Sequence, residues 1–209
     1  MKAELERISP AEIESRSFEI ISRELPHPID ESLAPVIKRV IHATADFEYA
    51  DSLCFSEGVL DQALAALRGG ATIVTDTTMA LAGINKLALA RHGCEALCYI
   101  GDEDVSRCAA GEGITRSAAA VDKAARLDQP LIFAVGNAPT ALIRICELIA
   151  TGHLHPKLVI GVPVGFVNVV QSKEMLLRAG VPCIVARGRK GGSSVAAAIC
   201  NALLYMLGR

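Results

Sequence analysis

The stretch Leu131-Ile132-Phe133-Ala134-Val135-Gly136-Asn137 decides the fold of this 209-residue chain. Five apolar residues end in a short turn, and a helix is expected directly afterwards, from about Ala138 to Ala150. No polar residue alternates with the apolar ones, so both faces of this strand are predicted to be covered. Strands of this kind are typical of parallel sheets, in which helices lie on both sides.

Four more apolar runs repeat this arrangement along the chain. They cover residues 71–75, 95–100, 158–162 and 182–186, and helices are expected at about 78–91, from about 115, at about 169–179 and at about 193–207. Strands that alternate with helices indicate an α/β fold with a parallel sheet. Five such strands favour a flavodoxin-like, doubly wound five-stranded sheet with α/β/α layers.

The first part of the chain has a different character. Three helical segments are expected there, from Ser9 to about Glu24, from near Ser32, and from Ser56 to Arg68. No linker-like stretch separates them from the sheet region. We therefore predict a single domain over residues 1–209, in which residues 1–70 form an N-terminal helical layer on the α/β core of residues 71–209.

The overall composition excludes several classes of function. A net charge of -2 argues against broad nucleic-acid binding, which needs a surplus of basic residues. No apolar run reaches the ~20 residues that a membrane-spanning helix needs. The seven cysteines are scattered, contain no CxxC pair, and occur without an evident signal peptide. We therefore expect a cytoplasmic protein without a nucleic-acid or membrane partner.

The loops that follow the five strands predict a binding site for an anion. Ligands of open parallel sheets bind beyond the carboxyl ends of the strands, and each loop here runs into a helix N-terminus, which favours negative charge. The residues expected to bind the ligand are Thr77, Arg116, Asn137, Arg189 and Lys190. Taken singly, each loop is explained equally well by turn formation and helix capping. The set, with its three cations, favours a ligand that has several negative groups.

Asp76 follows the first strand, where it could act as an acid or base or simply cap a helix. Common catalytic motifs are absent: residues 188–194 do not form a Walker A loop, and no GxGxxG, GxSxG or HExxH occurs. His153 and His155 precede the fourth strand, at the edge opposite the expected site, so no metal site is predicted. From the residues alone, the chain is an enzyme or a binder for a polyanionic organic ligand.

His42 is the candidate catalytic residue of the N-terminal region. It lies beside an apolar helix stripe and shares its own face with Lys38, Arg39 and Asp46. Nearby positive charge disfavours the imidazolium form, and an anionic ligand favours it again, which suits a proton donor that its substrate activates. Taken alone, an exposed histidine without a role is the commoner explanation of such a position.

Several motifs in fixed order resemble the precorrin-8X methylmutase family of cobalamin biosynthesis, from about Ser9 to the C-terminus. They are Arg16-Ser17-Phe18, Arg39-Val40-Ile41-His42, Thr115-Arg116-Ser117-Ala118-Ala119-Ala120, Gly136-Asn137-Ala138-Pro139-Thr140-Ala141-Leu142, Gly161-Val162-Pro163-Val164-Gly165-Phe166-Val167 and Gly188-Arg189-Lys190-Gly191-Gly192-Ser193. The chain departs from the usual family pattern at residues 168–174, where the family shows small residues and a glutamate before Ser-Lys.

The resemblance implies an isomerase that moves a methyl group from C-11 to C-12 of a corrin precursor by a 1,5-sigmatropic shift. The product would be cobyrinic acid, or hydrogenobyrinic acid in the metal-free route. It also implies a homodimer with a shared active site, catalysis by His42, and substrate contacts from Ser17, Arg39 and Arg116. Residues 75–80 and 83–86 resemble the cobalt branch. No cofactor is expected, since any cobalt belongs to the corrinoid substrate.

Two other functions remain open. An enzyme of the same fold that handles a phosphorylated metabolite would bind phosphate or a nucleotide without binding a corrinoid. A non-catalytic tetrapyrrole-binding protein would bind and release its pigment with an unchanged spectrum.

Overall fold

Five parallel strands form the predicted doubly wound sheet. The computed structural model describes residues 8–10 and 12–208. The parallel strands are β2 (Thr72–Thr75), β3 (Glu95–Leu97), β4 (Leu131–Val135), β5 (Leu158–Gly161) and β6 (Cys183–Ala186). They are ordered β3-β2-β4-β5-β6 across the sheet. Numbered by their place among the parallel strands, this is the flavodoxin-like order 2-1-3-4-5, and the predicted topology is confirmed.

A sixth strand corrects the expected number of five. β1 (Leu53–Phe55) lies within the region predicted to be helical and pairs antiparallel with β6, with Leu53 opposite Ala186. Three residues are too few to display a periodic pattern. The strand forms because it pairs with the otherwise open edge of β6, a requirement of the sheet that the local sequence does not show.

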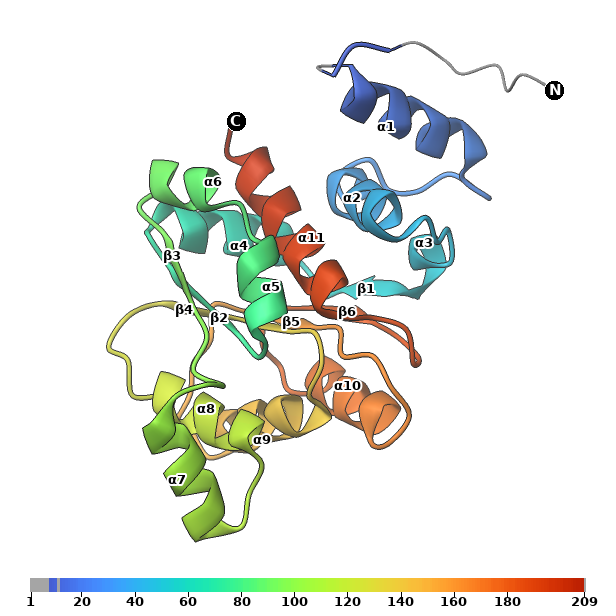
Figure 1. Cartoon of the computed structure of the whole chain (residues 1–209). Helices are drawn as coiled ribbons and strands as arrows, with labels where there is room; N and C mark the ends of the chain where they lie inside the picture. Colours follow the sequence, from blue (N-terminus) through green and yellow to red (C-terminus); the bar gives the residue numbers. More distant parts are fainter. Residues whose placement is uncertain (1–7, 11, 209) are drawn as a thin grey trace, which may run out of the picture.

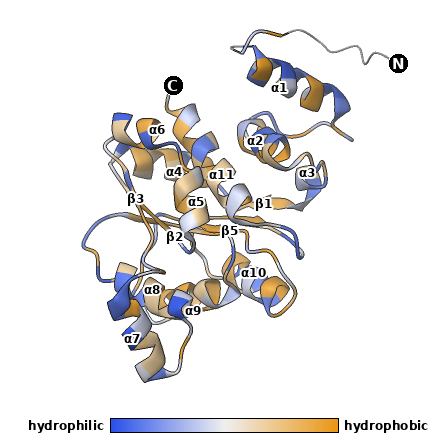
Figure 2. Cartoon of the chain, in the orientation of Figure 1, coloured by the Kyte–Doolittle hydropathy of each residue, from blue (hydrophilic) through white to orange (hydrophobic). Residues whose placement is uncertain are grey.

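Helices surround the sheet in two layers (Figure 1). Their bounds are α1 Ile13–Glu24, α2 Ala34–Thr44, α3 Tyr49–Ser52, α4 Val59–Arg68, α5 Thr78–Gly83, α6 Lys86–Arg91, α7 Glu103–Glu112, α8 Arg116–Ala124, α9 Pro139–Ala150, α10 Val169–Leu177 and α11 Ser193–Met206. The largest apolar cluster joins α2, α4, α5, α6 and α11 to one face of the sheet, and a second cluster joins α8, α9 and α10 to the other. Apolar residues accordingly concentrate along the strands between the layers (Figure 2).

The buried strands serve both layers by alternation. Ile132 and Ala134 of β4 belong to the cluster around α11, whereas Phe133 and Val135 belong to the cluster around α9. All four side chains are at most 2% exposed. Apolar residues at successive positions are therefore required on this strand, as its sequence predicted.

Two helix predictions were wrong in detail. The helix expected at 78–91 is two helices, because Ile84 is extended and the side chain of Asn85 starts α6 by accepting hydrogen bonds from the N–H groups of Leu87 and Ala88. Between the strand expected at 95–100 and the helix expected from about 115, where no element was predicted, the chain forms α7, whose C-cap Gly113 is left-handed. Its largely polar surface left little apolar periodicity to detect. In the described part of the chain, no helix has the length and apolar character to cross a bilayer.

The loop after β4 approaches the start of α11 so closely that it requires glycine at position 136. A Cβ on Gly136 would lie 2.7 Å from Ser193 Cα and 2.8 Å from Gly192 O. Gly136→Ala should therefore lower the free energy of unfolding by about 1–3 kcal/mol, the usual effect of overpacking against backbone. Urea denaturation measures this change.

Gly101→Ala is the matched control, because a Cβ there would meet no atom within 4 Å. Its effect should stay within about 0.5 kcal/mol. Equal stability of the two variants would contradict the close approach.

Candidate active site at the carboxyl ends of the strands

A buried carboxylate organises the point at which the sheet changes its winding direction. β2 leads to α5 on one face and β4 leads to α9 on the other, which is the arrangement at which such folds bind ligands. Asp76, directly after β2, is 7% exposed and accepts hydrogen bonds from the N–H groups of Gly136 (2.9 Å), Asn137 (2.8 Å) and Ala138 (2.7 Å). Desolvation raises the pKa of Asp76, and these three hydrogen bonds oppose the rise.

This geometry resolves the roles left open for Asp76. The cap of α5 is Thr77, whose hydroxyl accepts a hydrogen bond from the N–H of Ala80. The carboxylate oxygens of Asp76 are engaged by the neighbouring loop. Asp76 therefore acts as a clamp between the loops after β2 and β4.

A cavity of about 430 Å³ opens beside this clamp. It is lined by Asp76, Thr77, Thr78, Ile100, Thr115, Arg116, Ser117 and Asn137. Three residues predicted to bind the ligand, Thr77, Arg116 and Asn137, are thus brought together. Hydroxyl, amide and guanidinium groups give the cavity the donors that carboxylates bind.

The loop between β6 and α11 carries the two other predicted cations. A hydrogen bond of 2.7 Å between the hydroxyls of Thr77 and Ser193 holds the start of α11 beside the cavity. Arg189 lies over the ring of Phe166, with 5.3 Å between the guanidinium carbon and the ring centroid. Lys190 forms ion pairs with Asp46 (2.6 Å) and Glu48 (2.8 Å), so in this structure its ammonium is already bound.

The buried side chain of Lys173 binds the backbone of this loop, a role that was not predicted from the sequence. Its side chain is fully buried, and its ammonium donates hydrogen bonds to the backbone oxygens of Gly188 (2.9 Å) and Lys190 (2.8 Å). Burial lowers the pKa of Lys173 to about 8. A lysine on the apolar face of α10, next to the buried Leu176, is the signal that could have revealed it.

The second group of predicted residues lies on α1 and α2. The stripe expected on α2 is confirmed, since Val36, Ile37, Val40 and Ile41 are all buried. His42 is exposed in the last turn of α2. Ser17 on α1 donates a hydrogen bond to the carbonyl of Ile13 in its own helix.

Arg39 is more enclosed than the sequence suggested. Its side chain is 16% exposed and forms an ion pair with Glu14 of α1. The guanidinium also lies 4.7 Å from the ring centroid of Phe18 and 5.1 Å from that of Tyr205. A substrate carboxylate that binds Arg39 must therefore compete with Glu14.

The predicted residues thus form two groups rather than one cluster. Thr77, Arg116 and Asn137 line the cavity, whereas Ser17, Arg39 and His42 lie on α1 and α2. The ion pairs of Lys190 with Asp46 and Glu48 join the loop beside the cavity to the segment that follows α2. The two groups consequently belong to one connected edge of the molecule.

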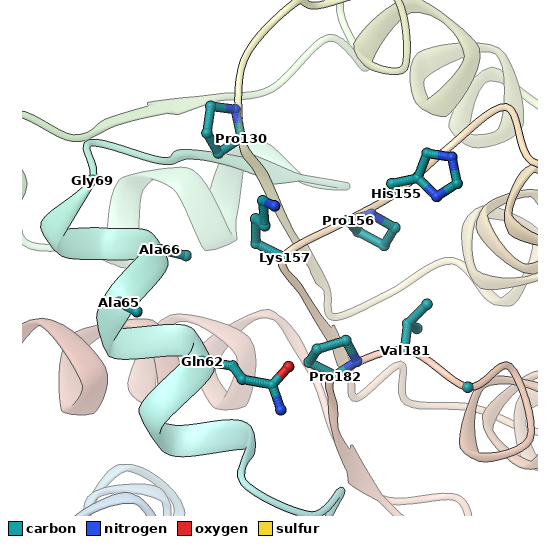
Figure 3. A pocket seen from close by; sticks show the side chains of 11 residues that line it. Gln62, Ala65, Ala66, Gly69, Pro130, His155, Pro156, Lys157, Val181 and Pro182 are labelled. Atoms are coloured by element: carbon teal, nitrogen blue, oxygen red, sulfur yellow. The ribbon is translucent and has the colours of Figure 1, made fainter.

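A larger cavity, of about 630 Å³, lies elsewhere (Figure 3). Pro130, Lys157 and Pro182 line it, and these residues directly precede β4, β5 and β6, so it opens at the amino ends of the strands. His155 also lines this cavity, in agreement with its predicted position at the edge of the sheet opposite the candidate site. Within residues 8–10 and 12–208, no group of three or more His, Cys, Asp and Glu side chains could hold a metal ion.

Lys173 should make stability depend on pH. Its pKa falls from 10.5 in an exposed lysine to about 8 in the folded protein. Between these values the unfolded chain binds more protons than the folded one, so the contribution of Lys173 to stability rises with pH. Lys173→Met should remove this rise. Between pH about 7.5 and about 10, the unfolding free energy of the original protein should therefore increase by roughly 1–3 kcal/mol more than that of the variant.

Urea titrations at the two pH values measure the difference. Lys157→Met, which removes an exposed lysine at the opposite edge, should show a constant difference from the original protein. A constant difference for Lys173→Met as well would contradict a buried, titrating ammonium.

The chain has extensive similarity to known proteins. The family model described as precorrin-8X methylmutase matches residues 12–206. A cobalt-precorrin-8 methylmutase from Salmonella typhimurium is 51% identical, covering 95% of this chain and 96% of that protein. A precorrin-8X methylmutase from Pseudomonas aeruginosa is 39% identical, with 84% and 85% covered. The crystal structure of a precorrin-8X methylmutase from Thermus thermophilus superimposes with a TM-score of 0.86 at 40% identity, covering 94% of this chain and 97% of that one.

These similarities cover at least 84% of both proteins in each comparison. They agree with the flavodoxin-like fold. The chain belongs to the precorrin-8X methylmutase family, whose members are isomerases of corrin biosynthesis.

Proposed function

We propose that this enzyme moves the methyl group at C-11 of cobalt-precorrin-8 to C-12 and so forms cobyrinic acid. The observation that carries the proposal is the polar cavity beside Asp76 in a chain of this family. This cavity lies at the switch point of the sheet, where the helices after β2 and β4 lie on opposite faces, and Thr77, Arg116 and Asn137 line it. The cobalt-containing substrate is favoured because the relatives from Salmonella typhimurium and Priestia megaterium, at 51% and 43% identity, are both cobalt-precorrin-8 methylmutases.

The surface around the cavity suits the substrate chemically. A corrinoid precursor carries acetate and propionate carboxylates around an apolar conjugated ring. Arg116 and Arg189 supply charges for the carboxylates. The loop after β5 presents Phe166 and Val167, each 79% exposed, as an apolar surface for the ring. Large apolar side chains that stay this exposed commonly mark a binding surface.

We assign the proton donor to His42. In the shift, the bond from the methyl carbon to C-11 breaks while its bond to C-12 forms, and no electrons enter or leave the molecule. A proton lent to the macrocycle withdraws electron density from the migrating centre and returns to His42 afterwards. Such acid catalysis contributes typically about 10²–10⁴-fold, and the remainder comes from holding the ring in a reactive geometry. The reaction as proposed needs no cofactor.

We also propose a homodimer in which the partner subunit helps to complete the site. The exposed apolar residues Met79 (70%) and Leu87 (74%), on α5 and α6, support it, since a second copy would cover them. A cytoplasmic location is supported by the seven cysteines, all free in the structure.

His42→Ala tests the catalytic assignment. The variant should bind the corrinoid with unchanged affinity and lower kcat by about 10²–10⁴-fold, because it loses only the proton donor. Visible absorption spectra follow both the bound pigment and its conversion. His153→Ala, which removes an exposed histidine at the opposite edge, should retain full activity.

Other outcomes would select a different function. Full turnover by His42→Ala would exclude the proposed role of His42. A pigment that the original protein binds and releases with an unchanged spectrum would indicate a carrier. Tight binding of phosphate or a nucleotide, without corrinoid binding, would indicate an enzyme for a phosphorylated metabolite.

Arg116→Ala tests the anion site. Loss of one charge-assisted hydrogen bond, worth about 1.5–3 kcal/mol, should weaken corrinoid binding by roughly 10- to 100-fold. Fluorescence or absorbance titration measures the Kd. Arg107→Ala removes an exposed arginine from α7, outside the cavity, and should leave the Kd unchanged. Equal Kd values for the two variants would place the substrate elsewhere.

A further inference from the structure

A stack of side chains runs from the C-terminal helix to His42. Tyr205 of α11 lies beside the guanidinium of Arg39 on α2, at 5.1 Å from the ring centroid. The same guanidinium lies 4.7 Å from the ring centroid of Phe18 on α1. The ring of Phe18 in turn lies 5.4 Å from the imidazole of His42, tilted by 50°. Three helices thus contribute to a continuous series of aromatic and cationic groups.

The far end of this stack is firmly anchored. Tyr205 accepts a hydrogen bond of 3.0 Å from the side chain of Asn85 and belongs to α11, whose central residues are almost all buried. Arg39 is 16% exposed, and its ion pair with Glu14 joins α2 to α1. Phe18 is therefore held on one side by a guanidinium that has little freedom to move. Cation–aromatic contacts of this kind attract the two groups to each other.

The near end of the stack lacks any comparable anchor. His42 is exposed, and within residues 8–10 and 12–208 no hydrogen bond to its imidazole is formed. Most catalytic histidines are oriented by a hydrogen bond to their second ring nitrogen. Here the ring contact with Phe18 is the interaction available to orient the imidazole.

We infer that Phe18 is a positioning residue for His42. Its ring restricts the rotation of the imidazole, because the two rings pack 5.4 Å apart between α1 and α2. Arg39 holds Phe18 in place, and the ion pair with Glu14 fixes Arg39 in turn. The inference rests on the proposed function, because it takes His42 to be the proton donor.

Two substitutions separate positioning from simple packing. Phe18→Leu keeps an apolar side chain and removes the aromatic face, so kcat should fall by roughly 10- to 100-fold, the effect of a misplaced catalytic group. KM should stay within about threefold, because Phe18 is assigned no substrate contact. Phe18→Tyr keeps the ring and should restore kcat to within about threefold of the original protein.

Steady-state kinetics on the full chain decide between the possibilities. A kcat for Phe18→Leu equal to that of the original protein would overturn the inference. Equal losses of kcat in the Leu and Tyr variants would also overturn it, since the aromatic face would then make no difference.

A measurement on the unsubstituted protein covers the case in which Phe18→Leu does not fold. The ring current of Phe18 should displace the carbon-bound ring-proton resonances of His42 from the positions of an exposed histidine. These resonances are assigned by their loss in His42→Gln. Undisplaced resonances would show that the rings do not meet in solution and would overturn the inference.

The two proposals fail in different ways. Full activity of His42→Ala would remove the proton donor itself and the proposed function of His42 with it. Loss of activity in His42→Ala, together with an unaffected Phe18→Leu, would overturn the role of Phe18 alone.

Discussion

The carboxylate of Asp76 is the constraint on which the rest of the site depends. Three backbone N–H groups of the loop after β4 converge on it, at 2.7–2.9 Å. Without the carboxylate, each of these buried N–H groups would lack a hydrogen-bond acceptor, which costs about 1–3 kcal/mol per group. Burial raises the pKa of Asp76, yet the same burial strengthens the hydrogen bonds that hold the two loops together. The cavity walls that carry Thr77, Arg116 and Asn137 are arranged around this clamp.

A buried side chain of opposite charge holds the loop between β6 and α11. Lys173 is buried beneath residues 188–190 and donates to two backbone oxygens, much as Asp76 accepts from three N–H groups. Buried charges that are satisfied by backbone groups fix the conformation of these loops. Through Lys190 and Asp46 the second loop is joined to the end of α2, and so to His42. The proposed anion site and the proposed proton donor are thus linked through this ion pair.

The sequence predicted the parallel sheet because β2, β4, β5 and β6 are buried on both faces. Phe133 and Ala134 of β4, which face opposite layers, show why no polar residue is tolerated in that strand. It did not predict β1, since pairing with β6 rather than its own pattern makes that strand. Glycines and basic residues indicated which loops follow the carboxyl ends of the strands. They could not show that Lys190 is already paired, that Arg39 is enclosed by Glu14 and Phe18, or that Lys173 supports a loop. Those facts depend on contacts between residues far apart in the chain.

The central claim is an intramolecular methyl shift, and the fate of an isotopic label tests it most directly. Cobalt-precorrin-8 that carries a ¹³C label in the methyl group at C-11 would be mixed with unlabelled substrate and converted by the enzyme. NMR and mass spectrometry of the product then locate and count the label. The account predicts that all of the label appears in the methyl group at C-12 of molecules that began as labelled substrate. Label that stays at C-11, or that is exchanged between molecules, would contradict it.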